Sequence, residues 1–290
     1  VDFQPAEFVK FATVVFLAYS VSKKGEKMAS FLFGFVPHLL VIGVLVSLLL
    51  AQPDFGTSVI LVVMMAVMLF ASGARILYLS GFGLLGLLGA AYAIVSSPYR
   101  MERITAFLEP WKHRQTAGYQ VSESLIAIGS GGLTGRGLGD GQGKLGYVPE
   151  LWNDFIGTII AEELGFLGMA LLVGLFLTFV WRGFRIAFRA EDAFGRYLAF
   201  GLTTLIAIQA GGNLFVVTGL VPPKGLTLPF VSYGGSSMMV TMLSAGILLN
   251  IAKREPDWWE ETRDERERWW RRKRWERKRK NILERREDLR

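Results

Sequence analysis

The 290-residue sequence contains no cysteine and only two histidines, His38 and His113. Without cysteine the chain has neither a disulfide framework nor a thiolate metal site, and two histidines exclude a histidine-rich metal centre. GxGxxG occurs at 81–86 (GFGLLG) and at 141–146 (GQGKLG), but no predicted strand precedes either, and the GK at 143–144 is followed by leucine, so neither common nucleotide fingerprint has its required context. The chain starts with Val1 and shows no signal-peptide pattern, so we expect the natural protein to begin upstream.

Apolar residues are abundant: 51% of the chain is hydrophobic, although its last 38 residues are largely charged. Seven apolar stretches approach or exceed the ~20 residues that a membrane-crossing helix needs. Their cores are residues 5–22, 31–51, 55–72, 76–97, 154–181, 194–220 and 231–252. The sequence therefore predicts an all-α, polytopic transmembrane bundle of seven helices in residues 1–252, followed by a separate tail at 253–290.

The Lys and Arg residues of the short connections predict the orientation of the bundle. The short loops of one side, around QPDFG and PPKG, hold only Lys224. The other side holds the tail and Lys23, Lys24, Lys27, Arg75, Arg182, Arg185 and Arg189. We therefore expect the tail to be cytoplasmic. The connection of about 55 residues from Ser97 to Asn153 is then external, since long loops cross membranes largely regardless of charge.

This long connection shows no obvious secondary structure apart from an amphipathic VSESLIAIG. Loops of such length are usually functional or disordered. Its aromatic, aliphatic and glycine residues argue against simple disorder. We therefore expect it to fold against the membrane surface or a ligand.

Six motifs link the chain to a known family. They are FQPAEFVK, AQPDFGTS, AFLEPWKHRQTAGYQ, IGSGGLTGRGLG, KLGYVPELWNDFIGTIIAEELGFLG and PPKGLTLPFVSYGGSS. In this order they resemble the SEDS family of bacterial cell-wall polymerases, the FtsW, RodA and SpoVE type. The match runs from Phe3 to about Ala252, and KGLTLPFVSYGGSS is closer to the division type than to the elongation type. Because the family has ten helices, the resemblance implies that three helices precede the seven present here.

The resemblance also implies an activity, a membrane and partners. Members of the family polymerise lipid II, the lipid-linked disaccharide-pentapeptide, into glycan strands at the outer face of the bacterial cytoplasmic membrane. They act with a class B penicillin-binding protein, which crosslinks the strands, and with other membrane proteins of the division or elongation machinery. No nucleic acid partner is expected.

Joining a sugar hydroxyl to an anomeric carbon requires a base for the hydroxyl proton. Asp154 is the best candidate, because it ends the external connection and begins an apolar helix whose dipole favours a carboxylate. A simple helix-capping role is the alternative, and residue chemistry alone leaves the two about even. The resemblance favours catalysis, because the family's essential aspartate matches Asp154 in PELWNDF. The chain departs from the family there in having Trp152 and Asn153, where histidine and threonine are common.

The departing diphosphate needs a cation, which a basic side chain or a divalent ion such as Mg²⁺ or Mn²⁺ would supply. Lys224, between prolines and a glycine, is the first choice for substrate binding. Lys144, Arg136, Arg114, Arg103 and Arg100 are the other cations of the outer side, although a solvated surface charge is the commoner role of such residues. Ser232 and Ser236 of LPFVSYGGSS are hydroxyl candidates at one wall of a cavity, and packing by small residues is the alternative there.

Five further ionisable residues fall within or next to the apolar stretches: Asp54, Glu7, Lys10, Glu162 and Glu163. Such residues usually face the interior of a bundle and have partners. We expect Glu7 and Lys10 to neutralise each other at i, i+3 spacing. For Glu162 and Glu163 we favour a structural hydrogen-bonding role, and for Asp54 either a cavity wall or a helix cap.

Two other classes of function remain open. A flippase or transporter for a lipid-linked precursor would also show a polar cavity and interrupted helices, and a non-catalytic scaffold of the cell-wall machinery would keep the bundle. A transporter needs charge along a path through the membrane, whereas a polymerase needs its base where donor and acceptor meet outside. Asp154 at the outer surface favours the polymerase.

The tail, Lys253–Arg290, has 16 basic and 11 acidic residues and five tryptophans. The pairs Trp258–Trp259 and Trp269–Trp270 are 11 residues apart, which is three helical turns, so they would share one face of a helix. Tryptophan on one face and arginine on the other suits an interfacial helix on anionic lipid. Nucleic-acid binding and a solvated charged extension are the alternatives.

The orientation is testable by cysteine labelling. In intact cells an external, membrane-impermeant reagent should label a cysteine introduced near Gly141 and leave cysteines near Lys24 and Arg185 unlabelled, because the basic side is cytoplasmic. The reverse pattern would overturn both the orientation and an external active site.

The tail peptide should bind anionic vesicles with a gain in helicity, and added salt should weaken the binding because lipid charge attracts it. Circular dichroism and vesicle sedimentation measure both effects. A peptide that gains no helicity with anionic vesicles at low salt would contradict the interfacial helix.

Overall fold

The computed structural model describes residues 4–116, 118–141, 153–223, 225–253 and 270–271. Its helices are α1 Pro5–Lys24, η1 Gly25–Ala29, η2 Phe31–Phe35, α2 Val36–Ala51, α3 Phe55–Ala71, α4 Ile76–Val95, α5 Pro98–Leu108, α6 Tyr119–Gly131, α7 Ile156–Arg189, α8 Ala193–Val217 and α9 Gly235–Ala252. Nearly all of the tail lies outside these ranges, so the interfacial helix stays a prediction.

The predicted class, a polytopic helical membrane protein, is confirmed. Within the described ranges six segments are long and apolar enough to cross a membrane: α1, η2 with α2, α4, α7, α8 and α9. The remaining predicted span, residues 55–72, corresponds to α3, which is also apolar but has only 17 residues. Each predicted apolar core therefore falls on a helix.

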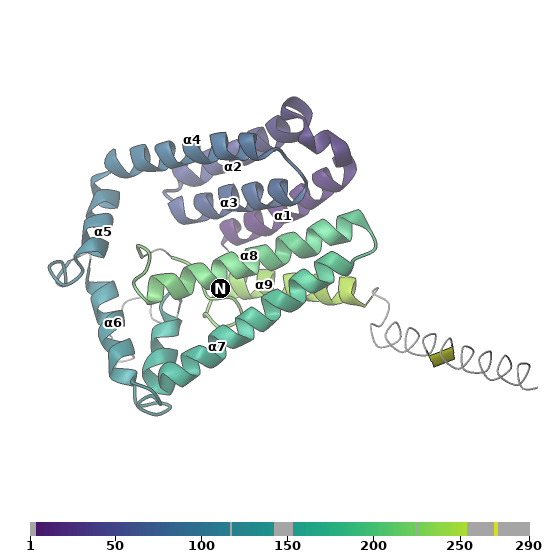
Figure 1. Cartoon of the computed structure of the whole chain (residues 1–290). Helices are drawn as coiled ribbons and strands as arrows, with labels where there is room; N and C mark the ends of the chain where they lie inside the picture. Colours follow the sequence, from purple (N-terminus) through teal and green to yellow (C-terminus); the bar gives the residue numbers. More distant parts are fainter. Residues whose placement is uncertain (1–3, 117, 142–152, 224, 254–269, 272–290) are drawn as a thin grey trace, which may run out of the picture.

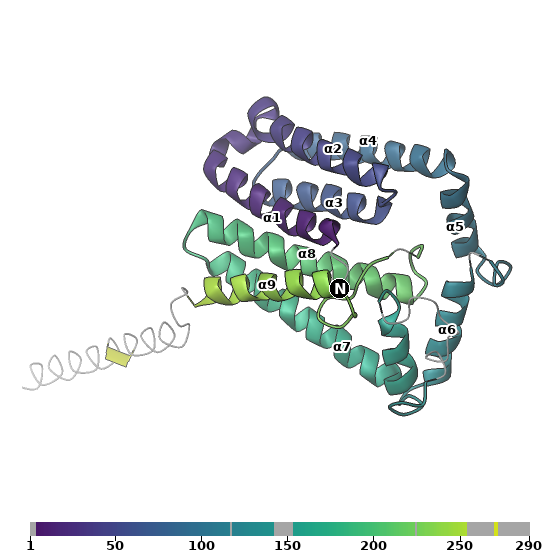
Figure 2. The same cartoon turned by 180° about the vertical axis from the view of Figure 1, so that it is seen from behind.

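Helix α8 lies at the centre of the bundle, with α1 and α3 on one side and α7 and α9 on the other (Figures 1 and 2). Leu202 and Leu205 of α8 are fully buried in one apolar core with Leu17 of α1 and Met65 and Met68 of α3. Helix α4 is different, because none of its residues is buried. Most of its leucines are exposed, which suits a helix in contact with lipid, whereas Leu79 packs against the core.

The connection between α4 and α7 contains two helices, α5 and α6, which lie across one end of the bundle (Figure 1). Helix α6 contains the amphipathic stretch found in the sequence, but the expectation of irregular structure is wrong for 98–108. Pro98 suits the first turn of α5, where its missing N–H is not needed. The last helical residue is Leu108. The C-cap Glu109 has a non-helical φ of −129°, because Pro110 follows it.

Helix α7 is interrupted at Gly165, which has φ +66° and ψ −162°. The segment after α6 supplies partners for the backbone groups that the break exposes. The N–H groups of Arg136 and Gly137 donate to the carbonyls of Glu162 and Glu163 at 3.0 and 3.1 Å. On the far side of the break, the N–H groups of Phe166 and Leu167 donate to the carbonyls of residues 132 and 133. Irregular backbone in a membrane protein persists where other protein satisfies it in this way.

Replacing Gly165 with alanine should destabilise the protein. The new Cβ would lie 2.3 Å from the backbone nitrogen of Gly135, and positive φ alone costs a non-glycine residue about 1–3 kcal/mol. We expect the thermal unfolding midpoint in detergent to fall by roughly 5 °C or more. Gly174→Ala in the same helix is the matched control, because its Cβ would meet nothing within 4 Å. Equal midpoints for the two variants would show that the break tolerates a side chain.

Candidate functional site

A cavity of about 790 Å³ opens at the end of the bundle where α5 lies. Its walls are the start of α1, the α2–α3 turn, the end of α4, α5, one side of α8 and the segment Val221–Leu226. Ligand sites in proteins typically have volumes of about 300–1,000 Å³, so the cavity is large enough for a small polar ligand.

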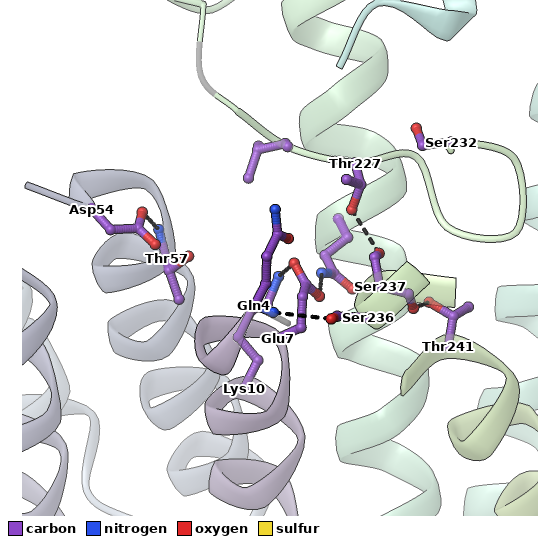
Figure 3. A network of polar contacts seen from close by, with 12 residues as sticks. Gln4, Glu7, Lys10, Asp54, Thr57, Thr227, Ser232, Ser236, Ser237 and Thr241 are labelled. Carbon is purple, nitrogen blue, oxygen red and sulfur yellow. Dashed lines mark hydrogen bonds and ion pairs between the residues drawn. The ribbon is translucent and has the colours of Figure 1, made fainter. Parts of the chain in front are cut away.

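A buried ion pair lies at the α1 wall. Lys10 Nζ donates to Glu7 Oε1 at 2.7 Å, and Gln209 Nε2 of α8 donates to Glu7 Oε2 at 3.4 Å. Figure 3 shows this group between the start of α3 and the start of α9. The expected i, i+3 pair is therefore present, and Glu7 lines the cavity. Pairing allows both charges to remain in an apolar bundle.

Two arginines of α5 line the opposite part of the cavity. Arg100 Nη1 donates to the carbonyl of Ala93 at 2.9 Å, and Arg103 Nη1 donates to the carbonyl of Pro223 at 3.4 Å. The Arg103 guanidinium also lies over the ring of Tyr99, 4.8 Å from its centroid. A guanidinium has five N–H donors, so one carbonyl contact leaves others available to an anionic ligand. Arg103 thus lies where a substrate-binding cation is useful.

Asp54 has both of the roles that the sequence suggested for it, a helix cap and a residue of the cavity wall. Its carboxylate accepts from the N–H of Thr57 at 3.0 Å, which makes it the N-cap of α3, and the residue also lines the cavity. Figure 3 shows this contact on the side of the cavity facing Glu7.

Asp154 lies in the turn before α7. The helix begins at Ile156 and its N-cap is Phe155, so the expectation that Asp154 begins the helix is wrong by two residues. Asp154 is half-buried, and its carbonyl accepts from Asn213 Nδ2 of α8 at 2.7 Å. A Cβ built on Gly225 would lie 3.3 Å from Asp154 Oδ2, and Gly225 lines the cavity. A glycine without a side chain therefore separates this carboxylate from the cavity.

Ser232 and Ser236, the two serines of LPFVSYGGSS predicted as hydroxyl candidates, bind other parts of the protein. Ser232 Oγ accepts from the N–H of Leu228 at 2.7 Å and donates to the carbonyl of Asn153 at 2.5 Å. Ser236 Oγ accepts from the N–H of Gln4 at 3.0 Å (Figure 3). Both serines are buried. These contacts join the stretch before α9 to α1 and to the turn before α7.

The other predicted residues lie away from this cavity or outside the described ranges. Arg114 pairs with Glu123 at 2.9 Å, and Arg136 Nη1 lies 3.5 Å from Glu162 Oε1. Glu163 Oε2 accepts from the N–H of Gly139 at 3.1 Å, so both glutamates contact the glycine-rich segment after α6. The remaining two, Lys144 and Lys224, fall on residues that the structure does not describe.

Sequence reasoning missed Gln209 and Asn213, which contact Glu7 and Asp154. Both are buried amides of α8, four residues apart on one face of an apolar helix. Polar residues inside a membrane span are functional candidates by default, so their spacing was a usable signal.

The described ranges contain no cluster of three or more His, Asp or Glu side chains that would hold a metal ion. The described residues therefore do not by themselves provide three such ligands for a divalent cation.

Comparison with known proteins places the chain in a family. The model of a cell cycle protein family, that of FtsW, RodA and SpoVE, matches residues 1–256. The chain is 46% identical over 253 residues to a probable peptidoglycan glycosyltransferase FtsW of Geobacter sp. strain M18, covering 87% of this chain and 69% of that protein. It is 45% identical over 250 residues to the stage V sporulation protein E of Bacillus subtilis strain 168, covering 86% and 68%. The chain thus spans about two thirds of the length of these relatives.

Two solved structures are similar to the whole described bundle. One comes from a study of how a peptidoglycan synthase complex coordinates polymerisation and crosslinking, with a TM-score of 0.73 at 28% identity, covering 89% of this chain and 72% of that one. The other is the rod shape determining protein RodA of Thermus thermophilus, with a TM-score of 0.61 at 26% identity, covering 88% and 67%. The family match, the identities and the shared fold agree, and the chain belongs to the FtsW, RodA and SpoVE family, known as SEDS.

Proposed function

We propose that the chain polymerises lipid II into glycan strands, with Asp154 as the general base. The class of reaction follows from the family, and the chain is a peptidoglycan glycosyltransferase. The observation that supports the residue assignment is the position of the Asp154 carboxylate, which lies beside Gly225 in the wall of a cavity that Arg100 and Arg103 also line.

In the proposed reaction, the hydroxyl oxygen of the acceptor sugar bonds to the anomeric carbon of the donor. The bond from that carbon to the diphosphate breaks at the same time, and polyprenyl diphosphate leaves. Asp154 takes the hydroxyl proton, which makes the attacking oxygen a better nucleophile. Arg100 and Arg103 stabilise the negative charge that develops on the diphosphate, because their guanidinium groups donate charge-assisted hydrogen bonds to phosphate oxygens.

The position of the cavity favours a polymerase over a transporter. Pro5, Asp54 and Ile94, which line it, lie at or near the ends of three different helices. The basic residues Lys24 and Arg189 lie at the opposite ends of α1 and α7. If those basic ends are cytoplasmic, the cavity and Asp154 are on the outer side, where donor and acceptor meet. A transporter would need charge along a path through the bundle, whereas the buried side chains of α8, polar and apolar, are all uncharged types.

The finer setting of the reaction belongs to the same proposal. We place the protein in the bacterial cytoplasmic membrane with the tail in the cytoplasm. We assign it a class B penicillin-binding protein as crosslinking partner within the division or elongation machinery. The similar structure from a complex that coordinates polymerisation and crosslinking supports such a partner.

Asp154→Asn, made in the full-length protein and assayed with its partner, should reduce polymerisation of lipid II by about 10²- to 10⁴-fold, since an amide cannot take up the proton. Asparagine keeps the size of the side chain, and the main-chain contact of residue 154 with Asn213 does not depend on that side chain. Expression, membrane insertion and partner binding should stay near wild type. The assay measures glycan product by gel and lipid translocation in the same vesicles.

Glu162→Gln is the matched control for this experiment. It also replaces a carboxylate of α7 with an amide, but its contacts are with the segment after α6. Any loss should therefore follow the amount of folded protein. Substantial polymerisation by well-folded Asp154→Asn would contradict the role of Asp154 as base, and translocation without polymerisation by the wild type would favour the transporter.

A further inference from the structure

We propose that Asn213 is a positioning residue, whose amide fixes the turn of Asp154 against the cavity-lining segment Val221–Leu226. Asn213 is fully buried in α8, near the end of that helix. Its Nδ2 donates to two main-chain carbonyls at once, that of Asp154 at 2.7 Å and that of Leu226 at 2.5 Å. The inference rests on the proposed role of Asp154 as base.

The chemistry of the two partners explains why an amide is needed. The groups that face each other here are both carbonyl oxygens, and two acceptors cannot hydrogen-bond to one another. A primary amide has two N–H donors on one nitrogen, so a single side chain can satisfy both carbonyls. Among the described residues, Asn213 Oδ1 has no hydrogen-bond partner. Burying an acceptor without a hydrogen bond costs free energy, and an apolar side chain at this position would not incur that cost. The two hydrogen bonds that the amide donates must therefore offset it.

A second side chain makes a parallel link. Ser232 Oγ accepts from the N–H of Leu228 and donates to the carbonyl of Asn153, again joining the turn before α7 to the segment before α9. Residues 153–154 and 226–228 are therefore held side by side by two side chains. The two links together fix the separation of the two segments.

This separation matters for chemistry because Gly225 precedes Leu226 and borders the Asp154 carboxylate. With the Asn213 link intact, a Cβ on Gly225 would be 3.3 Å from Asp154 Oδ2. If the link is lost, Asp154 and the wall at Gly225 can move apart without unfolding α7 or α8. Misplacing a reacting group by about 1 Å can cost ~10²-fold in rate. Loss of the link should therefore lower kcat more than it weakens substrate binding.

Asn213→Leu tests the proposal, since leucine has the same branching and the same number of side-chain heavy atoms, although it is larger, and has no donor. In nanodiscs with lipid II and the partner, we expect kcat per folded protein to fall about 10- to 100-fold, with KM changed by less than about threefold. Hydrogen exchange should become faster in peptides covering 153–158 and 221–232, because both segments are less restrained.

Ser124→Ala is the matched control. Ser124, in α6, is also fully buried, and it contacts the first turn of α7. Like Asn213 it makes two hydrogen bonds, with Thr158 Oγ1 at 2.7 Å and with the carbonyl of Val217 at 3.0 Å. Neither contact involves residues 153–154 or 226–228. Its stability loss should resemble that of Asn213→Leu, while its kcat per folded protein should stay within about twofold of wild type.

Each result decides one point. Equal kcat for Asn213→Leu and wild type, or an equal fall for Ser124→Ala, would overturn the positioning role. A wild type that does not polymerise lipid II would overturn the proposed function. In that case the exchange measurement still decides the link, because unchanged exchange at 221–232 in Asn213→Leu would show that Asn213 does not hold the segment.

Discussion

Inside a membrane protein, backbone N–H and C=O groups that are not paired within a helix need other hydrogen-bond partners. This constraint applies at two places along one short stretch, just before α7 and at the break within α7. Before the helix, the carbonyls of Asn153 and Asp154 accept from side chains of residues 232 and 213. At the break, the carbonyls of Glu162 and Glu163 accept from backbone N–H groups of the segment after α6. The stretch from Asp154 to Gly165 is therefore held at both ends by segments remote in sequence.

The same arrangement gives three nearby carboxylates different surroundings. Glu162 and Glu163 contact the glycine-rich segment after α6: Glu162 pairs with Arg136, and Glu163 accepts from the N–H of Gly139. Asp154, about two helical turns earlier, faces Gly225 at the cavity wall. Different environments allow neighbouring carboxylates to serve structural and chemical roles at the same time. The regular helix from Ile156 to Leu164 separates the proposed base from the two glutamates next to the break.

Much of the fold was predictable from sequence, because apolar length and motif order are local properties. The helix cores and the i, i+3 pair of Glu7 and Lys10 followed from such patterns. Helix α5 was missed because its composition resembles a polar loop and only Pro98 marked its start. The roles of Asn213 and Ser232 were not predictable, since their partners are main-chain carbonyls 59 and 79 residues away, and sequence does not show which carbonyls lack partners.

The segment Val221–Leu226 connects the two kinds of group that the proposed reaction needs. The carbonyl of Pro223 accepts from Arg103, and Gly225, two residues later, borders Asp154. Pro222 and Pro223 restrict the backbone at one end of the segment, and the Asn213 link holds Leu226 at the other. In the proposed reaction, the described residues of this segment therefore lie between the cation that would bind the diphosphate and the carboxylate that would take the hydroxyl proton. Because Leu226 and Asp154 are both held by Asn213, this arrangement would depend on α8, the most buried of the candidate membrane spans, although the proposed base precedes α7 and the proposed cations are on α5.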